Sequence, residues 1–192
     1  MNYRWTETPE IRQKIIEIEA LKLHLSQNPP NPEILINLRR HSLLKSAVYS
    51  ARIENIPAEI SDPQVHRKLE VQNLLSGYNY LKSPKLPKKL TVNLIKRLHK
   101  LVLKNLSYTA GSLRQEPWAI YNQAGVAVYL APLHTLVPKL MNQFVQYINS
   151  LGYPISQKAA IAQFIFEKIH PFADGNGRVG RLISTQILNS SG

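Results

Sequence analysis

Apolar residues recur every three or four positions along most of this chain, which is the period of an amphipathic α-helix. Two stretches open with the same signal, a polar residue followed by proline and glutamate, at Thr8-Pro9-Glu10 and Asn31-Pro32-Glu33. These residue types are typical of a helix N-cap, the first helical position and the first turn. The helices that they predict carry apolar stripes at Ile11, Ile15, Ile18 and Leu25, and at Ile34, Leu35 and Leu38.

Five further stretches repeat the helical period. Their apolar positions are Leu69, Leu74, Leu75, Tyr78 and Leu81; Leu94, Ile95, Leu98, Leu101 and Val102, after Thr91; Val137, Leu140, Met141, Phe144, Tyr147, Ile148 and Leu151; residues 159–166; and Val179, Leu182, Ile183 and Ile187. The stretch 159–166 is apolar nearly all round, which indicates a buried helix. We interpret all seven stripes as core packing, and the sequence predicts a mainly α fold.

Residues 118–129 depart from this pattern. The runs Trp118-Ala119-Ile120-Tyr121 and Val126-Ala127-Val128-Tyr129 are rich in β-branched and aromatic residues, and residues 122–125 between them have the composition of a turn. The sequence therefore predicts a short β-hairpin within a helical protein.

The stretch from residue 170 to residue 181 combines glycines and arginines in a pattern suited to phosphate. Gly175 and Gly177 allow backbone N–H groups to approach an anion, and a helix N-terminus at this point would add partial positive charge. Arg178 and Arg181 are three residues apart, so on a helix both guanidinium groups can reach phosphate oxygens.

The same stretch also holds an imidazole and a carboxylate. Asp174 supplies hard oxygen atoms, the ligands that magnesium prefers beside substrate phosphates. His170 is the one residue of the stretch that can take up a proton near neutral pH. Together these groups predict a phosphate-handling active site.

This stretch resembles the signature of the Fic (Fido) family, His-x-Phe-x-Asp/Glu-Gly-Asn-Gly-Arg-x-x-Arg. Its eight constrained positions are met by His170, Phe172, Asp174, Gly175, Asn176, Gly177, Arg178 and Arg181. Eight fixed identities at fixed spacing arise by chance at about 10⁻¹⁰ per start position, so we take the match as functional. The resemblance implies a protein adenylyltransferase, which transfers AMP from Mg-ATP to a hydroxyl side chain of a target protein. Gly177 favours this activity, because the phosphorylating variant of the family has lysine there.

The resemblance also implies a role for each residue of the signature. His170 would be the base on the target hydroxyl, and Asp174 the ligand of Mg²⁺. The phosphates of ATP would be held by Gly175, Asn176 and Gly177, by Arg178 at the β-phosphate and by Arg181 at the γ-phosphate. In this family a hairpin flap holds the main chain of the target over the active site. That role falls here on Val126, Ala127, Val128 and Tyr129.

Residues 50–55 resemble a second family motif, the inhibitory Ser/Thr-x-x-x-Glu-Gly/Asn that precedes the core in one subclass. Ser50 and Glu54 would lie on one face of a helix. The resemblance implies that Glu54 pairs with Arg181 and so removes the partner of the γ-phosphate. We therefore expect ATP to bind weakly, or out of line for transfer, while Glu54 is in place.

The resemblance suggests how the chain is divided. We expect a helical extension at residues 1–41 and a Fic domain at residues 42–192, with the inhibitory helix at about 42–56. Domains of this family commonly continue into further helices, so we also expect the domain to extend past residue 192.

Composition sets wider bounds. The 192 residues include 24 Lys and Arg, 12 Asp and Glu and no cysteine, which excludes disulfides and cysteine-ligated zinc. The N-terminus does not resemble a signal peptide and there is no long apolar run, so we expect a cytoplasmic protein without a membrane segment.

Two alternatives stay open beside the transferase. A formal charge of +12 is compatible with a basic nucleic-acid-binding module, although the basic residues are scattered and match no known binding motif. Alternatively, the same site could remove AMP, with Glu54 orienting a water molecule. The target protein, self-modification and the oligomeric state are also left open by the sequence.

Overall fold

The structure is a computed structural model that describes residues 3–84 and 86–190, and it confirms the mainly α fold. The α-helices are α1 Pro9–Gln27, α2 Pro32–Ile53, α3 Leu69–Tyr80, α4 Val92–Val102, α5 Val137–Ser150, α6 Ile155–Ile169 and α7 Asn176–Asn189. The other elements are two 3-10 helices, η1 Val65–Arg67 and η2 His134–Leu136, and a two-stranded antiparallel sheet of β1 Ala119–Tyr121 and β2 Ala127–Leu130.

Helices α1, α2 and α4 each begin at a polar residue whose side chain caps the helix. Thr8 accepts a hydrogen bond from the backbone N–H of Ile11 at the start of α1. Asn31 accepts one from Glu33 at the start of α2, and Thr91 accepts one from Leu94 at the start of α4. Each bond satisfies a backbone donor that has no partner inside the helix. The two predicted N-caps, Thr8 and Asn31, are therefore confirmed, and Thr91 caps α4 in the same way.

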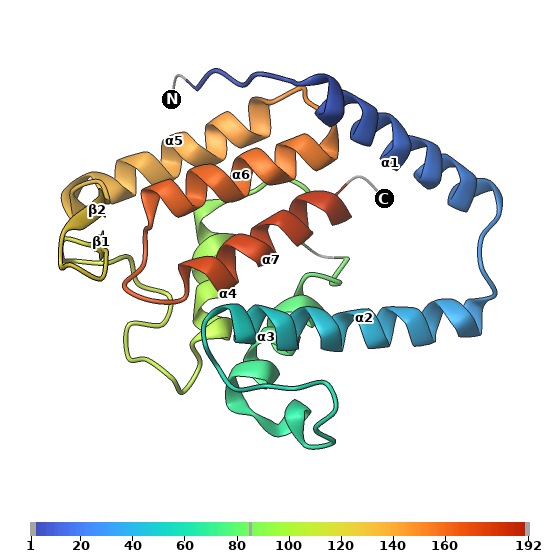
Figure 1. Ribbon diagram of the computed structural model, residues 1–192, viewed down its shortest axis with the longest axis horizontal. Coiled ribbons are helices and arrows are strands. Elements are labelled where there is room, and N and C mark those ends of the chain that lie inside the picture. The colour runs from blue at the N-terminus through green and yellow to red at the C-terminus, as the bar shows by residue number, and fades with distance from the viewer. Residues whose placement is uncertain (1–2, 85, 191–192) are drawn as a thin grey trace.

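The core lies between α4, α5, α6 and α7, with the C-terminal half of α2 and α3 packed on the other side of α7 (Figure 1). Its largest fully buried side chains include Phe144, Phe166 and Phe172. Helices α6 and α7 approach closely because Gly180 has no side chain. A Cβ at this position would lie 2.7 Å from a Glu167 carboxylate oxygen and 3.4 Å from the Phe166 ring.

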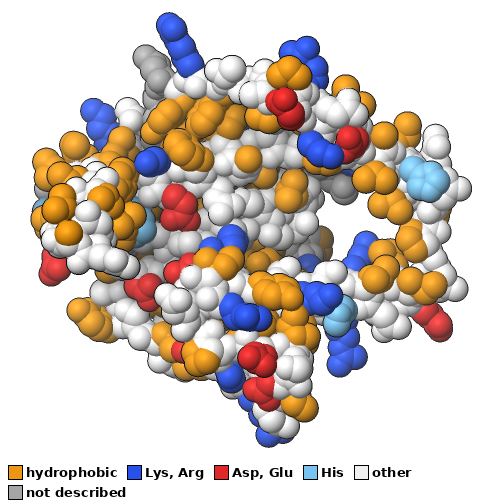
Figure 2. All heavy atoms as spheres, viewed as in Figure 1, with side chains coloured by type: hydrophobic (Ala, Val, Ile, Leu, Met, Phe, Trp, Pro, Cys, Tyr) orange, Lys and Arg blue, Asp and Glu red, His pale blue; other side chains and the backbone are white. Residues whose placement is uncertain are grey.

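The first apolar stripe does not pack in the core, contrary to our interpretation. All residues of α1 are exposed or half-buried, and Ile11, Ile18 and Leu25 are each more than two-fifths exposed. The reason is tertiary: α1 extends away from the helical body and is held near its start. Figure 2 shows an opening between α1, α2 and the rest of the molecule, with hydrophobic side chains along both helices.

Contacts near the N-terminus hold α1 in place. The indole N–H of Trp5 donates to the Tyr147 hydroxyl at 3.0 Å, and the Trp5 ring packs edge-on against Phe164. The Gln157 amide donates to the Glu7 carboxylate at 3.2 Å.

Helix α2 is continuous, but only its C-terminal half packs against the core. Ile34 and Leu38 are more than half exposed, so the second stripe is not core packing either. The buried residues of α2 are Ala47, Val48, Ser50 and Ala51, which lie in the half that contacts α3 and α7. The helix runs without a break through residues 41 and 42, where we expected the extension to end.

The predicted hairpin is present. Its strands pair Ala119 with Leu130 and Ile120 with Tyr129, and a bulge follows before Tyr121 pairs with Ala127. The turn forms because the Asn122 side chain accepts two backbone N–H bonds and Gly125 takes a left-handed conformation.

Two further expectations concerned a membrane segment and the C-terminal boundary of the domain. Within the described residues, none of the helices is long and apolar enough to cross a bilayer. The expected domain boundary at residue 192 lies outside the described residues.

Candidate active site

The signature stretch forms the loop between α6 and α7 together with the first turn of α7. His170 ends α6 in the left-handed conformation with φ of 47°, which is uncommon for residues other than glycine. Gly175 is also left-handed, with φ of 76°, and directly precedes α7. The loop thus joins the end of one buried helix to the N-terminus of the next.

Asn176 holds this loop closed. Its side-chain oxygen accepts the Phe172 N–H at 3.0 Å, and its amide nitrogen donates to the Phe172 carbonyl at 2.8 Å. The side chain is 2% exposed and points into the protein. Of the expected phosphate cradle, Asn176 can therefore offer its backbone but not its side chain.

The His170 ring lies under an aromatic cover. The Trp118 ring stacks on it with 3.5 Å between ring centroids. Burial lowers the pKa of His170 to about 4, although a hydrogen bond to the backbone carbonyl of Glu167 acts in the opposite direction. The imidazole is therefore neutral near pH 7, with one nitrogen bonded to a carbonyl and the other able to accept a proton.

Arg114 connects the hairpin to the signature loop. Its guanidinium donates to the His170 carbonyl at 2.7 Å, to the Glu116 carbonyl at 2.8 Å and to the Pro132 carbonyl. Its backbone N–H also donates to the carbonyl of Pro171 at 2.9 Å. The side chain is 5% exposed, so these bonds form in a largely dry environment where they hold the two segments together.

Asp174 pairs with the first arginine of the signature. One carboxylate oxygen accepts from the Arg178 guanidinium at 2.8 Å, and the other accepts the Gly175 N–H at 2.6 Å. The Asp174 side chain is 65% exposed, whereas that of Arg178 is 6% exposed. The Nε of Arg178 is buried and finds no partner among the described residues. The two guanidinium groups thus differ: Arg178 lies beneath the site and Arg181 lies beside it.

The N-terminus of α7 faces the carboxylate of Glu54. A Cβ at Gly177 would lie 2.4 Å from a Glu54 oxygen and 3.2 Å from an Arg181 nitrogen. The absence of a side chain at Gly177 is therefore what allows Glu54 to approach the helix end. A carboxylate is favoured there because the first turn of a helix carries unpaired N–H groups and partial positive charge.

Arg181 reaches across to α2. Its guanidinium donates to the Glu54 carboxylate at 2.8 Å, to the Ser50 hydroxyl at 2.8 Å and to the Ser50 carbonyl at 3.0 Å. The contact between Glu54 and Arg181 that we expected is thus present. Ser50 is 2% exposed and supplies two of the three bonds, so it fixes the direction of the guanidinium.

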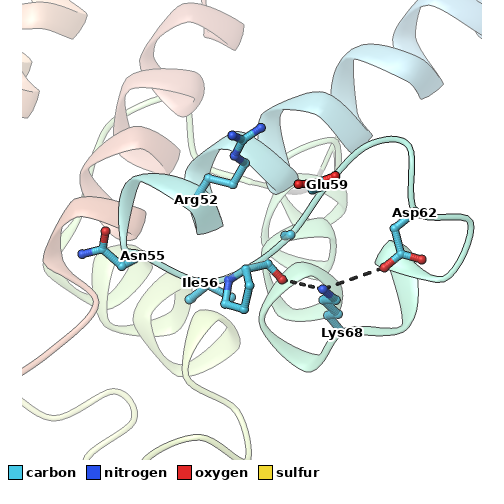
Figure 3. Close-up of a pocket in the computed structure, with 8 residues that line it drawn as sticks. Arg52, Asn55, Ile56, Glu59, Asp62 and Lys68 are labelled. Carbon is cyan, nitrogen blue, oxygen red and sulfur yellow. Dashed lines mark hydrogen bonds and ion pairs between the residues drawn. The ribbon is translucent and has the colours of Figure 1, made fainter.

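The loop after α2 fixes the end of the helix that carries Glu54. Asn55 is left-handed with φ of 59°, and the N–H groups of Asn55 and Ile56 bond back to Arg52 and Ala51 in a helix-terminating pattern. Beyond it, the ammonium of Lys68 bonds to the Pro57 carbonyl and lies 3.8 Å from the Asp62 carboxylate (Figure 3).

The hairpin residues lie beside the signature loop rather than on it. Val126 and Val128 are each 60% exposed, and Ala127 is exposed as well. Tyr129 turns toward α6, where its hydroxyl donates to the Lys168 carbonyl and its ring lies 4.5 Å from the Lys168 ammonium. The exposed residues leave the hairpin free to meet another molecule.

His99 was missed in the sequence because it stands within the apolar stripe of α4 and has no recognisable motif. It is fully buried, and its ring nitrogens contact the Gly111 N–H at 2.7 Å and the Asp174 carbonyl at 3.0 Å. Burial lowers its pKa to about 4. The contact of Arg114 with His170 was not predicted either, since only the folded chain brings these two residues together.

The sequence matches the Fic/DOC family over residues 89–188. A probable protein adenylyltransferase of Aquifex aeolicus is 27% identical over 161 residues, which are 77% of this chain and 48% of that protein. A protein adenylyltransferase Fic of Drosophila melanogaster is 32% identical over 108 residues, which are 54% of this chain and 20% of that protein. The chain therefore spans about half or less of the length of these relatives.

A solved structure shares the fold. A Fic domain containing signaling protein from Bacteroides thetaiotaomicron superposes with a TM-score of 0.81 at 21% identity, over 93% of this chain and 73% of that one.

Proposed function

The chain belongs to the Fic/DOC family, and on that premise we propose that it is a protein adenylyltransferase held inactive by its own Glu54. The reaction would move AMP from ATP to a hydroxyl side chain of a target protein. The Aquifex relative, a probable protein adenylyltransferase, and the Drosophila relative, a protein adenylyltransferase, support this activity class.

One observation carries the proposal. The Glu54 carboxylate occupies a position that suits an anion, against Gly177 at the N-terminus of α7 and bonded to Arg181. A phosphate group has the same needs as this carboxylate: close backbone N–H groups, a helix N-terminus and a guanidinium. The site is therefore built for an anion and presently holds one from the protein itself.

In the proposed reaction the target hydroxyl oxygen attacks the α-phosphorus of ATP. The new O–P bond forms as the bond from the α-phosphorus to the oxygen bridging the β-phosphate breaks, and pyrophosphate leaves. His170 accepts the hydroxyl proton on its unprotonated ring nitrogen, which is available because burial keeps the ring neutral. Arg114 fixes the backbone of His170 by a hydrogen bond to its carbonyl, and the Trp118 ring stacks on the imidazole, so that together they hold the ring in place.

Asp174 is the residue that would hold magnesium. Its exposed carboxylate fits the requirement, since Mg²⁺ is commonly bound by one or two carboxylates together with substrate phosphates. Among the described residues there is no cluster of three or more His, Cys, Asp or Glu. Magnesium bound there would neutralise charge on the leaving pyrophosphate. Arg178 would then be shared between Asp174 and a phosphate.

The hairpin is where we place the target protein. Exposed backbone on β2 could pair with an extended segment of the target, which would bring a hydroxyl toward His170. Arg114 ties this hairpin to the signature loop, and a target bound on β2 would therefore be held at a fixed distance from the base.

Labelled ATP tests the proposal. Wild type, Glu54→Gly and the double variant Glu54→Gly/His170→Ala are each incubated with a cell lysate and with ATP labelled at the α- or γ-phosphate. We expect protein labelling from the α-position alone, about 10–100-fold stronger in Glu54→Gly, because a charge-assisted pair of about 1.5–3 kcal/mol is released. His170→Ala should lower the labelling rate about 10²–10⁴-fold.

Glu59→Gln is the matched control for the inhibitory role. Glu59 lies five residues after Glu54 and is exposed, and its carboxylate accepts a hydrogen bond from the Ser61 hydroxyl rather than from Arg181. It should label as weakly as wild type. Equal labelling by wild type and Glu54→Gly would contradict inhibition by Glu54, and label from the γ-position alone would identify a kinase instead.

Removal of AMP is the second candidate reaction, and one observation favours it. Burial lowers the pKa of His170 and raises the pKa of Glu167, and in both cases the negative charge of Glu54 acts to raise the pKa. Such a carboxylate could orient a water molecule for attack on an AMP-modified side chain. Incubation of an AMP-labelled target with wild type and with Glu54→Gly separates the two reactions: release of AMP by wild type alone would support removal.

A further inference from the structure

His99 links three parts of the molecule through a single ring. The backbone N–H of Gly111, on the segment that leads to the hairpin, donates to His99 Nδ1 at 2.7 Å. Because Nδ1 accepts this bond, the proton of the neutral ring sits on Nε2. Nε2 therefore donates to the Asp174 carbonyl, which lies 3.0 Å away.

The Asp174 carbonyl belongs to the peptide whose other end is the Gly175 N–H. This peptide is trans, as are all described peptides, so its N–H points away from its C=O. With the oxygen drawn inward by His99, the N–H is directed to the opposite side. There it meets the Asp174 carboxylate at 2.6 Å, and that side chain is 65% exposed.

The ring is held rigidly enough to set this direction. It is fully buried, and it stacks on Phe172 with 3.7 Å between ring centroids and 5° between planes. Phe172 is in turn bonded through its backbone to Asn176, the first residue of α7. His99 thus touches both sides of the turn that begins the helix.

We propose that His99 is a positioning residue for the anion site: through its Nε2–H it orients the Asp174–Gly175 peptide so that the Gly175 N–H faces the phosphate position. The inference rests on the proposed nucleotide site, and it assigns that site a buried residue of α4 outside the signature. A ligand phosphate would replace the Asp174 carboxylate oxygen as the acceptor of this N–H. His99 itself stays within the protein and makes no contact with the reacting atoms.

Two substitutions separate the two ring nitrogens. Glutamine carries an amide nitrogen at the same distance along the side chain as Nε2, so His99→Gln can still donate to Asp174. Asparagine carries an oxygen at the position of Nδ1, so His99→Asn can still accept from Gly111 but cannot donate to Asp174. Both remove the aromatic ring and its stacking, and they form a matched pair for loss of packing.

The experiment uses the full chain in the Glu54→Gly background and Mg-ATP as the probe. Affinity is measured by titration calorimetry, and the melting temperature is measured without nucleotide. We expect His99→Gln to bind within about threefold of the background and His99→Asn to bind at least tenfold more weakly, since one charge-assisted hydrogen bond is worth about 1.5–3 kcal/mol. The melting temperatures of the pair should be similar, because both have lost the same ring.

Equal affinities for the two variants would overturn the inference and leave His99 a packing residue. Failure of the Glu54→Gly background itself to bind Mg-ATP would instead contradict the proposed function. The orientation of the Gly175 amide can then be followed directly by ¹⁵N-labelled NMR without nucleotide. Its resonance should be retained in His99→Gln and displaced in His99→Asn, and displacement of both alike would also overturn the inference.

Discussion

At the scale of single residues, the proposed base, His170, combines two unfavourable features. His170 adopts a left-handed backbone, a conformation that costs a residue other than glycine about 1–3 kcal/mol. Its ring is also buried beneath Trp118, which disfavours the protonated form. The Arg114 bond to its carbonyl offsets part of this cost by fixing the backbone. Strain of this kind is retained where the resulting geometry is useful.

The burial of His170 has a consequence for pH dependence. A base must be unprotonated to act, and the lowered pKa of about 4 keeps His170 unprotonated well below the ordinary value of 6.5. In Glu54→Gly, kcat/KM attributable to this group should therefore stay level as pH falls from 7 to 5, and decline as pH falls through about 4. Initial rates of α-label transfer across this range provide the measurement.

Trp118→Ala is the companion variant for the pH profile. Loss of the stacked ring hydrates His170 and should move the acid limb up toward 6.5. Far-ultraviolet circular dichroism at each pH shows whether the helices are still folded. A limb near 6.5 in both proteins would contradict the assigned desolvation of His170.

A separate prediction concerns the space next to Gly177. A methyl group at this position would occupy the volume now taken by the Glu54 oxygen, 2.4 Å from the added carbon. We expect Gly177→Ala in the Glu54→Gly background to lose the ATP-induced rise in melting temperature, which corresponds to about 2.7 kcal/mol at a ligand concentration of 100 Kd. The loss should occur because the methyl group, rather than the carboxylate, then excludes the phosphate.

Gly152→Ala is the control for that substitution. Among the described residues, nothing lies within 4 Å of a Cβ built at Gly152. This variant should keep the full ATP-induced shift. Retention of the shift in Gly177→Ala would show that the nucleotide lies elsewhere.

At the scale of elements, local signals predicted where α1 and α2 begin, and they did so because capping depends on neighbouring residues. Thr8, Asn31 and Thr91 each satisfy a backbone donor within three residues. The same signals could not predict burial, which depends on what packs against the helix. The stripe of α1 has the correct period, yet the fold provides no surface along most of its length.

In the candidate site, too, features that depend on local sequence were predicted, and features that depend on the folded chain were not. The signature stretch was found because its spacing in sequence is fixed, and the contact of Glu54 with Arg181 was expected from a second motif. The inward turn of Asn176 could not be predicted, because it requires the loop to close on Phe172. His99 and Arg114 act over separations of 75 and 56 residues, and no local pattern reports such contacts.

Helix α1 is the element whose stability we expect to be lowest. A helix of 19 residues without a buried face gains little from tertiary packing, and isolated helices of this length are marginal in water. Its backbone amides should therefore exchange with deuterium far faster than those of α6 and α7. Hydrogen exchange measured by mass spectrometry on the intact chain checks this expectation.

Trp5→Ala extends the test to the attachment of α1. Without the indole bond to Tyr147 and the contact with Phe164, the helix should detach, while the melting temperature of the core changes little. Protection of α1 equal to that of α6 in the wild-type chain would contradict a weakly held helix.

At the scale of the whole molecule, the site is assembled from three distant regions of the chain. The end of α2 supplies Ser50 and Glu54, the segment from α4 to β2 supplies the supports, and the stretch from α6 to α7 supplies the signature. The bond from Arg181 to Glu54 spans 127 residues. Any motion that withdraws the end of α2 from α7 would open the anion site without disturbing the signature loop.

On the proposed function, the placement of Glu54 would make it an internal competitor of the nucleotide. A separate inhibitor can be diluted away, but a carboxylate attached to the same chain keeps a constant effective concentration at the site. ATP then binds only the fraction of molecules in which Glu54 has withdrawn, and its apparent dissociation constant rises by the reciprocal of that fraction. On the proposed function, the protein would respond to ATP over a concentration range set by the position of α2, so that whatever holds or releases this helix determines when the enzyme is active.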